Sequence, residues 1–167
     1  MIRRARLDDL SALPAVEFSA ATAFRAIPDR AWLADDEAIS HAEHIALRER
    51  GITLVADGDG GICGFICSEP LGESLFIREV SVRHQDQGKG IGHGLLRALI
   101  DQARAAGWTR ITLTTFRDLA WNAPFYARLG FRELQADALA PELRLHLQRE
   151  IEHGLPAEHR CAMALDI

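Results

Sequence analysis

The sequence HQDQGKGIGHGLL, from His84 to Leu96, places four glycines within seven positions and then runs directly into leucines. Glycine has no Cβ, so its backbone lets another molecule approach closely and readily adopts left-handed conformations. Apolar residues continue at the spacing of one helix face until Gly107: Ile91, Leu95, Leu96, Leu99, Ile100 and Ala103. The stretch therefore predicts a glycine-rich loop that opens a helix.

Four interpretations of this loop compete. A dinucleotide fingerprint GxGxxG fails, because its last position falls on His93 or Leu95 when counted from Gly88 or Gly90. A Walker loop fails because Lys89 is followed by glycine instead of serine or threonine. A glycine-rich turn without a ligand is the third interpretation. The fourth is a diphosphate cradle, in which N–H groups at a helix N-terminus face the anion.

The chain ahead of the loop predicts helices followed by three sequential strands. We expect a short N-terminal strand, a helix capped near Asp8 or Asp9, and a helical region from about Leu13 to Arg50 that is interrupted at residues 27–29. The second half of that region, DDEAISHAEHIALRERG, is expected to be helical throughout. ITLVAD, GICGFICSE and SLFIREVSVR follow as strands joined by short turns, the first of them rich in Asp and Gly. This arrangement predicts an antiparallel meander.

After the glycine loop and its helix, the chain alternates between strands and helices. TRITLTTF is expected to run parallel to the strand ahead of the loop. Asn122 is expected to cap the short helix APFYARLG, and FREL, PELRLHLQREIEHG and HRCAMALDI follow as strand, helix and strand. The predicted fold is α+β, with a mixed, mostly antiparallel sheet of about seven strands, a central β-loop-α-β unit and flanking helices.

Composition limits the class of protein. A chain of 167 residues with 48% hydrophobic residues predicts one globular domain over residues 1–167. No apolar run approaches the roughly 20 residues of a membrane span, and the start does not resemble a signal peptide, so we expect a cytoplasmic protein without a membrane partner. The net charge of −5 argues against a nucleic-acid partner.

The cysteines and two nearby histidines predict no metal site. Three cysteines, Cys63, Cys67 and Cys161, fit reduced thiols packed in the interior. His41 and His44 lack the order of a zinc-binding HExxH motif. Both histidines are expected on a solvated helix face, with no metal bound.

Two motifs in the right order identify a family resemblance. QGKGIG, Gln87 to Gly92, resembles the Q/R-x-x-G-x-G/A signature of the GNAT acetyltransferase superfamily, and it follows the strand EVSV as in that family. NAPFYARLGF, Asn122 to Phe131, is similar to the family's N-x-x-F-Y-x-x-x-G-F segment, about 35 residues later. The resemblance covers roughly Ile52 to Leu134. It favours the diphosphate cradle over a turn without a ligand.

The resemblance implies acetyl-CoA as the acetyl donor, with its pyrophosphate on the glycine loop and its pantetheine arm paired with the preceding strand. That strand and TRITLTTF are splayed in the family, so that the arm enters between them. The residues implied to bind the cofactor are Val80, Ser81, Val82, Gln87, Gly88, Lys89, Gly90, Ile91, Gly92, His93 and Asn122.

The resemblance also implies catalytic residues. Tyr126, the only tyrosine of the chain, matches the family tyrosine that protonates the departing thiolate, against the alternative of an aromatic side chain that only packs beside Phe125 and Phe131. Glu79 occupies a position where some members carry a glutamate base, and it shares a strand face with Ser81. A salt bridge or a solvated sheet face is the alternative for Glu79.

The implied function is transfer of an acetyl group to a primary amine, directly within a ternary complex, with the acceptor left open among small amines, amino acids, antibiotics and protein N-termini. A non-catalytic acyl-CoA-binding sensor or partner module on the same fold is the alternative. Glu17 and the acidic run from Asp35 to Glu37 are by default a solvated face, with a role in binding a cationic acceptor as the sharper hypothesis. The segment from Gln135 to Ala157 is extra relative to a minimal member, and it would shape the acceptor pocket or pack in a homodimer.

Overall fold

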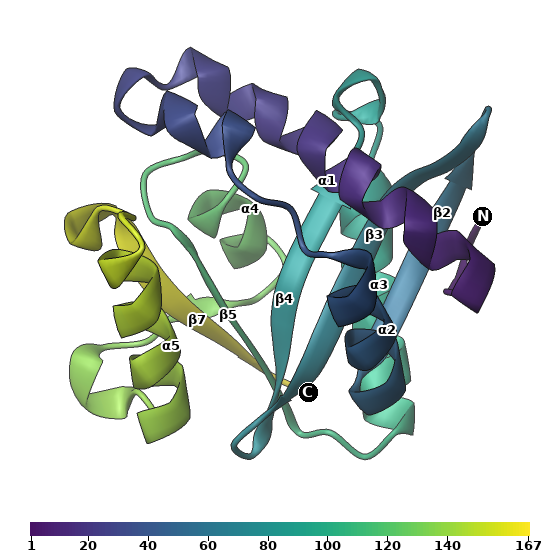
Figure 1. The fold of residues 1–167 in the computed structure, drawn as a ribbon. Coiled ribbons are helices and arrows are strands. Elements are labelled where there is room, and N and C mark those ends of the chain that lie inside the picture. Colours follow the sequence, from purple (N-terminus) through teal and green to yellow (C-terminus); the bar gives the residue numbers. More distant parts are fainter. The chain divides into compact units, whose positions relative to one another are not determined.

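A computed structural model describes the whole chain, Met1–Ile167. Figure 1 draws the chain as a ribbon coloured along its sequence. Seven strands form one sheet in the order β1-β2-β3-β4-β5-β7-β6. The strands are β1 (Ile2–Arg4), β2 (Ile52–Gly58), β3 (Gly61–Leu71), β4 (Ser74–Val82), β5 (Arg110–Phe116), β6 (Arg132–Glu133) and β7 (Arg160–Asp166). β4 and β5 pair in parallel, whereas the pairs β1–β2, β2–β3, β5–β7 and β6–β7 are antiparallel. The predicted mixed, mostly antiparallel α+β fold is therefore confirmed.

The chain divides into two compact units. The first consists of Met1–Glu69 and Arg78–Ala105, and the second of Pro70–Ile77 and Ala106–Ile167. The helices of the first unit are α1 (Leu13–Ala21), α2 (His41–Arg50) and α3 (Ile91–Ala105), with 3-10 turns η1 (Leu7–Ala12), η2 (Thr22–Ala26), η3 (Pro28–Asp35) and η4 (His84–Asp86). Those of the second are α4 (Ala123–Ala127) and α5 (Pro141–Glu152), with η5 (Ala136–Ala138) and η6 (Ala157–His159).

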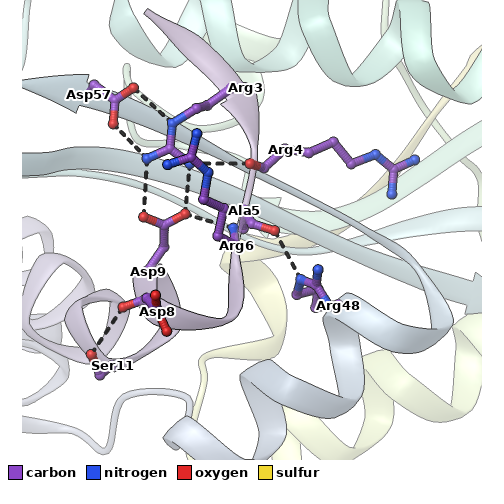
Figure 2. Close-up of polar contacts among 9 residues, drawn as sticks. All are labelled: Arg3, Arg4, Ala5, Arg6, Asp8, Asp9, Ser11, Arg48 and Asp57. Carbon is purple, nitrogen blue, oxygen red and sulfur yellow. Dashed lines mark hydrogen bonds and ion pairs between the residues drawn. The ribbon is translucent and has the colours of Figure 1, made fainter.

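Arg3 fixes the N-terminal segment of the first unit. Its guanidinium donates to both carboxylate oxygens of Asp57 on β2, at 2.8 and 3.0 Å, and to those of Asp9 in η1, at 2.7 and 3.1 Å (Figure 2). The bonds from Arg3 lower the pKa of the Asp9 carboxyl. Arg48 of α2 donates to the backbone oxygen of Ala5, 2.9 Å away. These charge-assisted bonds connect β1, η1, β2 and α2.

Two helix starts differ from the prediction. α2 begins at His41, because the Ser40 side chain accepts the backbone N–H of Glu43 and caps the helix there, so Asp35–Ile39 is not part of it. The region after Asp8 first forms a 3-10 turn, in which Asp9 accepts the N–H of Arg6, and the α-helix starts only at Leu13.

His44 contradicts the prediction of a solvated face. Its side chain is fully buried, with its ring edge-on to Phe65 at 5.2 Å between centroids. Burial lowers its pKa to about 4, so the ring is neutral at pH 7. His41 is exposed, as predicted. The prediction for His44 was wrong because the sequence alone did not show which face of α2 packs against β2 and β3, and His44 lies on that face.

Cys63 and Cys67 lie in the interior as predicted, Cys161 is buried as well, and all three are free thiols. Burial raises the pKa of the Cys67 thiol well above its usual value and that of Cys161 to about 11. Both are therefore protonated near neutral pH, which makes them poor nucleophiles. No group of three or more His, Cys, Asp or Glu side chains has a geometry that could hold a metal ion. None of the helices has both the length and the apolar character that a membrane crossing requires.

Candidate functional site

The glycine loop lies between β4 and α3, as predicted. Gly88 and Gly90 have φ of +75° and +82°, in the left-handed region that L side chains rarely adopt. A Cβ added at either residue would contact no protein atom within 4 Å, so the loop backbone is open on that side. The Gly94 N–H donates to Gly90 O at 3.0 Å and begins the helical hydrogen bonds.

The amides of Ile91, Gly92 and His93 form the first turn of α3, where backbone N–H groups have no partner within the helix. An open glycine backbone beside a helix N-terminus is an arrangement that binds anions. The loop therefore fits the diphosphate cradle that the sequence predicts.

Charged side chains around the loop form a chain of ion pairs that the sequence analysis missed. Asp86 accepts from Arg83 Nε at 2.8 Å and from Lys89 Nζ at 2.9 Å. The bond from Lys89, followed by that from Arg83, lowers the pKa of the Asp86 carboxyl. Arg83 also donates to the backbone oxygen of Asp59 in the β2–β3 turn, at 3.3 Å. Arg83 and Lys89 each lie three residues from Asp86 in the sequence, and this spacing could have predicted the two ion pairs. Lys89 is positively charged and largely exposed at the loop, yet it already has a carboxylate partner.

Polar contacts also connect the loop to α1. The backbone N–H of His84 donates to Ser19 Oγ at 3.1 Å, and the Gln87 side chain donates to Val82 O at 3.1 Å and to Ala20 O at 3.5 Å. Gln87 therefore contributes its side chain to the shape of the loop, in addition to the backbone contact that the family resemblance implies.

Close packing fixes the start of α3 against the strands. A Cβ on Gly64 of β3 would lie 3.1 Å from Ser81 O, 3.2 Å from Ile91 Cγ2 and 3.3 Å from Leu95 Cδ1. Only glycine leaves room for α3 to approach β3 this closely. The sequence GICGFIC gave no reason to select this glycine in advance.

Glu79 and Ser81 share a face of β4, as the alternation predicts. The Ser81 hydroxyl donates to Glu79 Oε1 at 2.7 Å, and Ser81 is buried while Glu79 is half-buried. The Glu79 carboxylate is near enough to Cys67 to contribute to the raised pKa of that thiol. Glu79 is thus a carboxylate held in place by a hydroxyl, which excludes a fully solvated sheet face.

Glu17 does not lie on a solvated face either. Its carboxylate accepts the backbone N–H of Ile39 at 2.9 Å, and burial raises its pKa. Asp35 remains exposed, with its nearest cation, Arg25, at 3.6 Å. The acidic residues of this region therefore have different roles, and Glu17 orders the segment that precedes α2.

The second unit contains Asn122 and Tyr126. Pro124 stands in the first turn of α4, as predicted, but the Asn122 side chain makes no capping bond. Its Oδ1 instead accepts the backbone N–H of Phe116, 3.3 Å away at the end of β5. The Asn122 backbone oxygen accepts the Tyr126 N–H at 3.1 Å, so Asn122 joins β5 to the helix that carries the tyrosine.

Aromatic neighbours orient the Tyr126 ring. It is edge-on to Phe125 at 5.3 Å and to Phe131 at 5.8 Å between centroids. The residue is half-buried, and the Phe131 N–H returns to Tyr126 O at 3.2 Å. A third backbone bond runs from the Leu129 N–H to Tyr126 O at 3.0 Å, so two ring contacts and three backbone bonds hold this residue in place.

Three solved structures share the fold of this chain. One similar structure is that of Rv2747 from Mycobacterium tuberculosis in complex with CoA and NLQ. Its TM-score is 0.74 and its sequence identity 21%, and the match covers 100% of this chain and 99% of that one. A second is the PaiA N-acetyltransferase of Thermoplasma acidophilum in complex with coenzyme A, with a TM-score of 0.72, 16% identity, and coverage of 100% and 98%. A third is the ribosomal-protein-S18-alanine N-acetyltransferase of Escherichia coli, with a TM-score of 0.70, 19% identity, and coverage of 100% and 93%. At these identities the similarity shows a shared fold.

The family model described as the acetyltransferase (GNAT) family matches residues 16–131, which include most of α1, the glycine loop and Tyr126. This match covers more than half of the chain. The protein belongs to the GNAT acetyltransferase family.

Proposed function

We propose that this protein transfers the acetyl group of acetyl-CoA to the nitrogen of a primary amine, directly and without an acyl-enzyme. The single observation that carries this proposal is the glycine loop. Gly88 and Gly90 present an open, left-handed backbone beside the free N–H groups of α3. That arrangement fits the pyrophosphate of a CoA thioester. The solved relatives that contain CoA support the same donor.

The proposed binding residues follow the loop and the strand ahead of it. The backbone of Gly88 to His93 would bind the pyrophosphate, and Gln87 would hold the loop through its bond to Val82 O. Residues Val80 to Val82 would pair with the pantetheine arm, and a backbone N–H at Val80 or Ser81 would stabilise the oxyanion. Asn122 would support the thioester end through its bonds to β5 and α4.

The proposed reaction needs a base and an acid. Glu79 takes one proton from the acceptor ammonium, directly or through water, and the neutral nitrogen attacks the thioester carbonyl carbon. The tetrahedral intermediate collapses with loss of the C–S bond, and Tyr126 gives its phenolic proton to the departing sulfur. The tyrosinate is then reprotonated by the amide-forming nitrogen or by solvent. The products are the acetylated amine, CoA thiol and one released proton.

Direct transfer is favoured because Cys67 and Cys161 are unsuited to covalent catalysis, and the third cysteine, Cys63, is buried. Cys67 is fully buried with a raised pKa, and Cys161 is buried with a pKa of about 11. Neither would form the thiolate that an acyl-enzyme requires at neutral pH.

The test is turnover of acetyl-CoA with a panel of defined amines, read as release of the CoA thiol and as the mass of the product. The panel holds a peptide with N-terminal alanine, a free amino acid, a linear polyamine and an aminoglycoside. Tyr126→Phe should lower kcat by about 10²- to 10⁴-fold while acetyl-CoA binding is unchanged. If wild-type protein binds acetyl-CoA but acetylates none of the panel, the non-catalytic sensor replaces the enzyme; equal turnover in Tyr126→Phe refutes the proton-donor role.

A further inference from the structure

A partly buried polar cluster joins α5 to the sheet of the second unit. Glu150 Oε2 accepts from Arg160 of β7 at 2.6 Å and from the Thr114 hydroxyl of β5 at 3.0 Å. His146, one helical turn before Glu150, has its Nε2 3.8 Å from the same oxygen. The Arg160 residue is 8% exposed. Glu150, Thr114 and His146 are half-buried, and one carboxylate oxygen joins α5, β5 and β7.

Apolar contacts position the same helix. Leu143 of α5 packs with Phe76 and Ala162, and the His146 ring lies 4.5 Å from the Phe76 ring. Figure 1 shows α5 lying alongside β7. Glu150 thus adds polar contacts to the apolar contacts that hold α5 against the sheet.

The cluster continues into the end of β5. The Arg160 guanidinium lies 4.7 Å from the centroid of the Phe116 ring, and Arg160 and Phe116 are opposite each other in the β5–β7 pairing. A cation over an aromatic face is attracted by the ring quadrupole, and the attraction is larger when the cation is desolvated. Glu150 thus bonds to a cation that in turn contacts the Phe116 ring.

Phe116 leads directly to the helix that carries Tyr126. Its N–H donates to Asn122 Oδ1 at 3.3 Å, and Asn122 O accepts the Tyr126 N–H at 3.1 Å. The contacts Glu150–Arg160–Phe116–Asn122–Tyr126 are continuous within the second unit. We name these five residues the α5 relay.

We propose that Glu150 is a positioning residue, which through the α5 relay fixes the orientation of α4 and hence of the Tyr126 phenol. This inference rests on the proposed function in its assignment of Tyr126 as the proton donor, and it assigns a role to the extra helix between β6 and β7. The consequence is that a conservative change on α5 alters catalysis while leaving the glycine loop as it is.

The first test needs no acceptor. Because the chain has one tyrosine, incorporation of 3-fluorotyrosine gives a single ¹⁹F resonance that reports on Tyr126. Glu150→Gln should shift or broaden that resonance. Glu152→Gln on the same helix is the matched control, because Glu152 is exposed and bonds only to Gln148 at 3.0 Å, and it should leave the resonance in place.

Stability is controlled separately, since Glu150→Gln leaves Arg160 buried without its counter-charge. Leu47→Ala, in the core of the first unit, provides a comparably destabilised protein whose relay is intact. A resonance shift in Glu150→Gln no larger than in Leu47→Ala would overturn the proposal. If Glu150→Gln does not fold, Glu150→Asp keeps the charge and shortens the reach, and an unshifted resonance in that variant overturns it equally.

The second test uses whichever panel amine the wild-type protein acetylates. Glu150→Gln should lower kcat by about 10- to 100-fold with unchanged acetyl-CoA affinity, the size expected when a reacting group is misplaced by a remote change. The loss should disappear in an Asn122→Ala background, because that variant already breaks the α5 relay. Full kcat in Glu150→Gln contradicts the relay, whereas absence of wild-type turnover contradicts the proposed function and leaves the ¹⁹F result to decide on the relay.

Discussion

Gly90→Ala is the most informative single change in the glycine loop. Its φ of +82° is a conformation that an L side chain adopts at a cost of about 1–2 kcal/mol. For a chain of this size, that cost lowers Tm by about 2–8 °C. The new methyl would meet no protein atom within 4 Å, so the variant should fold with this strain and no steric clash.

In the proposed complex, the same methyl would stand where the pyrophosphate approaches the backbone. Loss of about two hydrogen bonds from N–H groups to charged oxygens, each worth about 1.5–3 kcal/mol, weakens acetyl-CoA binding by about 100-fold or more. Isothermal titration calorimetry measures the affinity, and a thermal melt measures the strain.

Gly60→Ala is the matched control. Gly60 lies in the β2–β3 turn with φ of +80° and no protein atom within 4 Å of an added Cβ, so the change costs the same strain away from the loop. It should lower Tm equally and leave acetyl-CoA affinity unchanged. Equal acetyl-CoA affinities for the two variants would refute the loop as the diphosphate site.

Three further predictions concern the base, a buried histidine and the packing of α3. Glu79→Gln should lower kcat/KM at pH 7 by about 10²- to 10⁴-fold and recover part of it as rising pH supplies neutral amine; a parallel pH profile in the variant argues against a base. The pKa of His44 falls from 6.5 to about 4 on folding, so its contribution to stability is complete above pH 6.5 and is lost as pH falls through 4. Urea unfolding across that pH range should therefore show that the free energy of unfolding falls less in His44→Leu than in wild type, by up to about 3 kcal/mol. The same dependence of unfolding free energy on pH in both proteins would refute this. Gly64→Ala should cost about 1–3 kcal/mol and weaken acetyl-CoA binding, because three neighbours at 3.1–3.3 Å must move; an unchanged melt and affinity would show that α3 adjusts freely.

The sequence predicted most of the fold because its signals are local. A few neighbouring residues are enough to predict three features of the fold. These are the glycine turn between β2 and β3, the apolar face of α3 and the turn at Gly107. The start of α2 was misplaced because the Asp35–Glu37 run has the composition of a helix, while the Ser40 cap decides where the helix begins. Where the composition and the N-cap residue indicate different helix starts, as here, the N-cap residue determines where the helix begins.

The site was only partly predictable for a similar reason. The glycine loop and the partnership of Glu79 with Ser81 follow from spacing along the chain. The bond from Phe116 to Asn122, the burial of His44 and the α5 relay depend on residues that are brought together by the fold. Their sequence separations, such as 46 residues between Thr114 and Arg160, carry no local signal.

The most direct test of the central claim is a calorimetric titration of the wild-type protein with acetyl-CoA, with no acceptor present. We predict a Kd in the micromolar range, about −8 kcal/mol. Gly90→Ala should weaken this binding at least 100-fold or abolish it. Absence of binding up to millimolar acetyl-CoA would mean that the loop between β4 and α3 is only a turn in this chain, and the proposed acetyl transfer would be wrong.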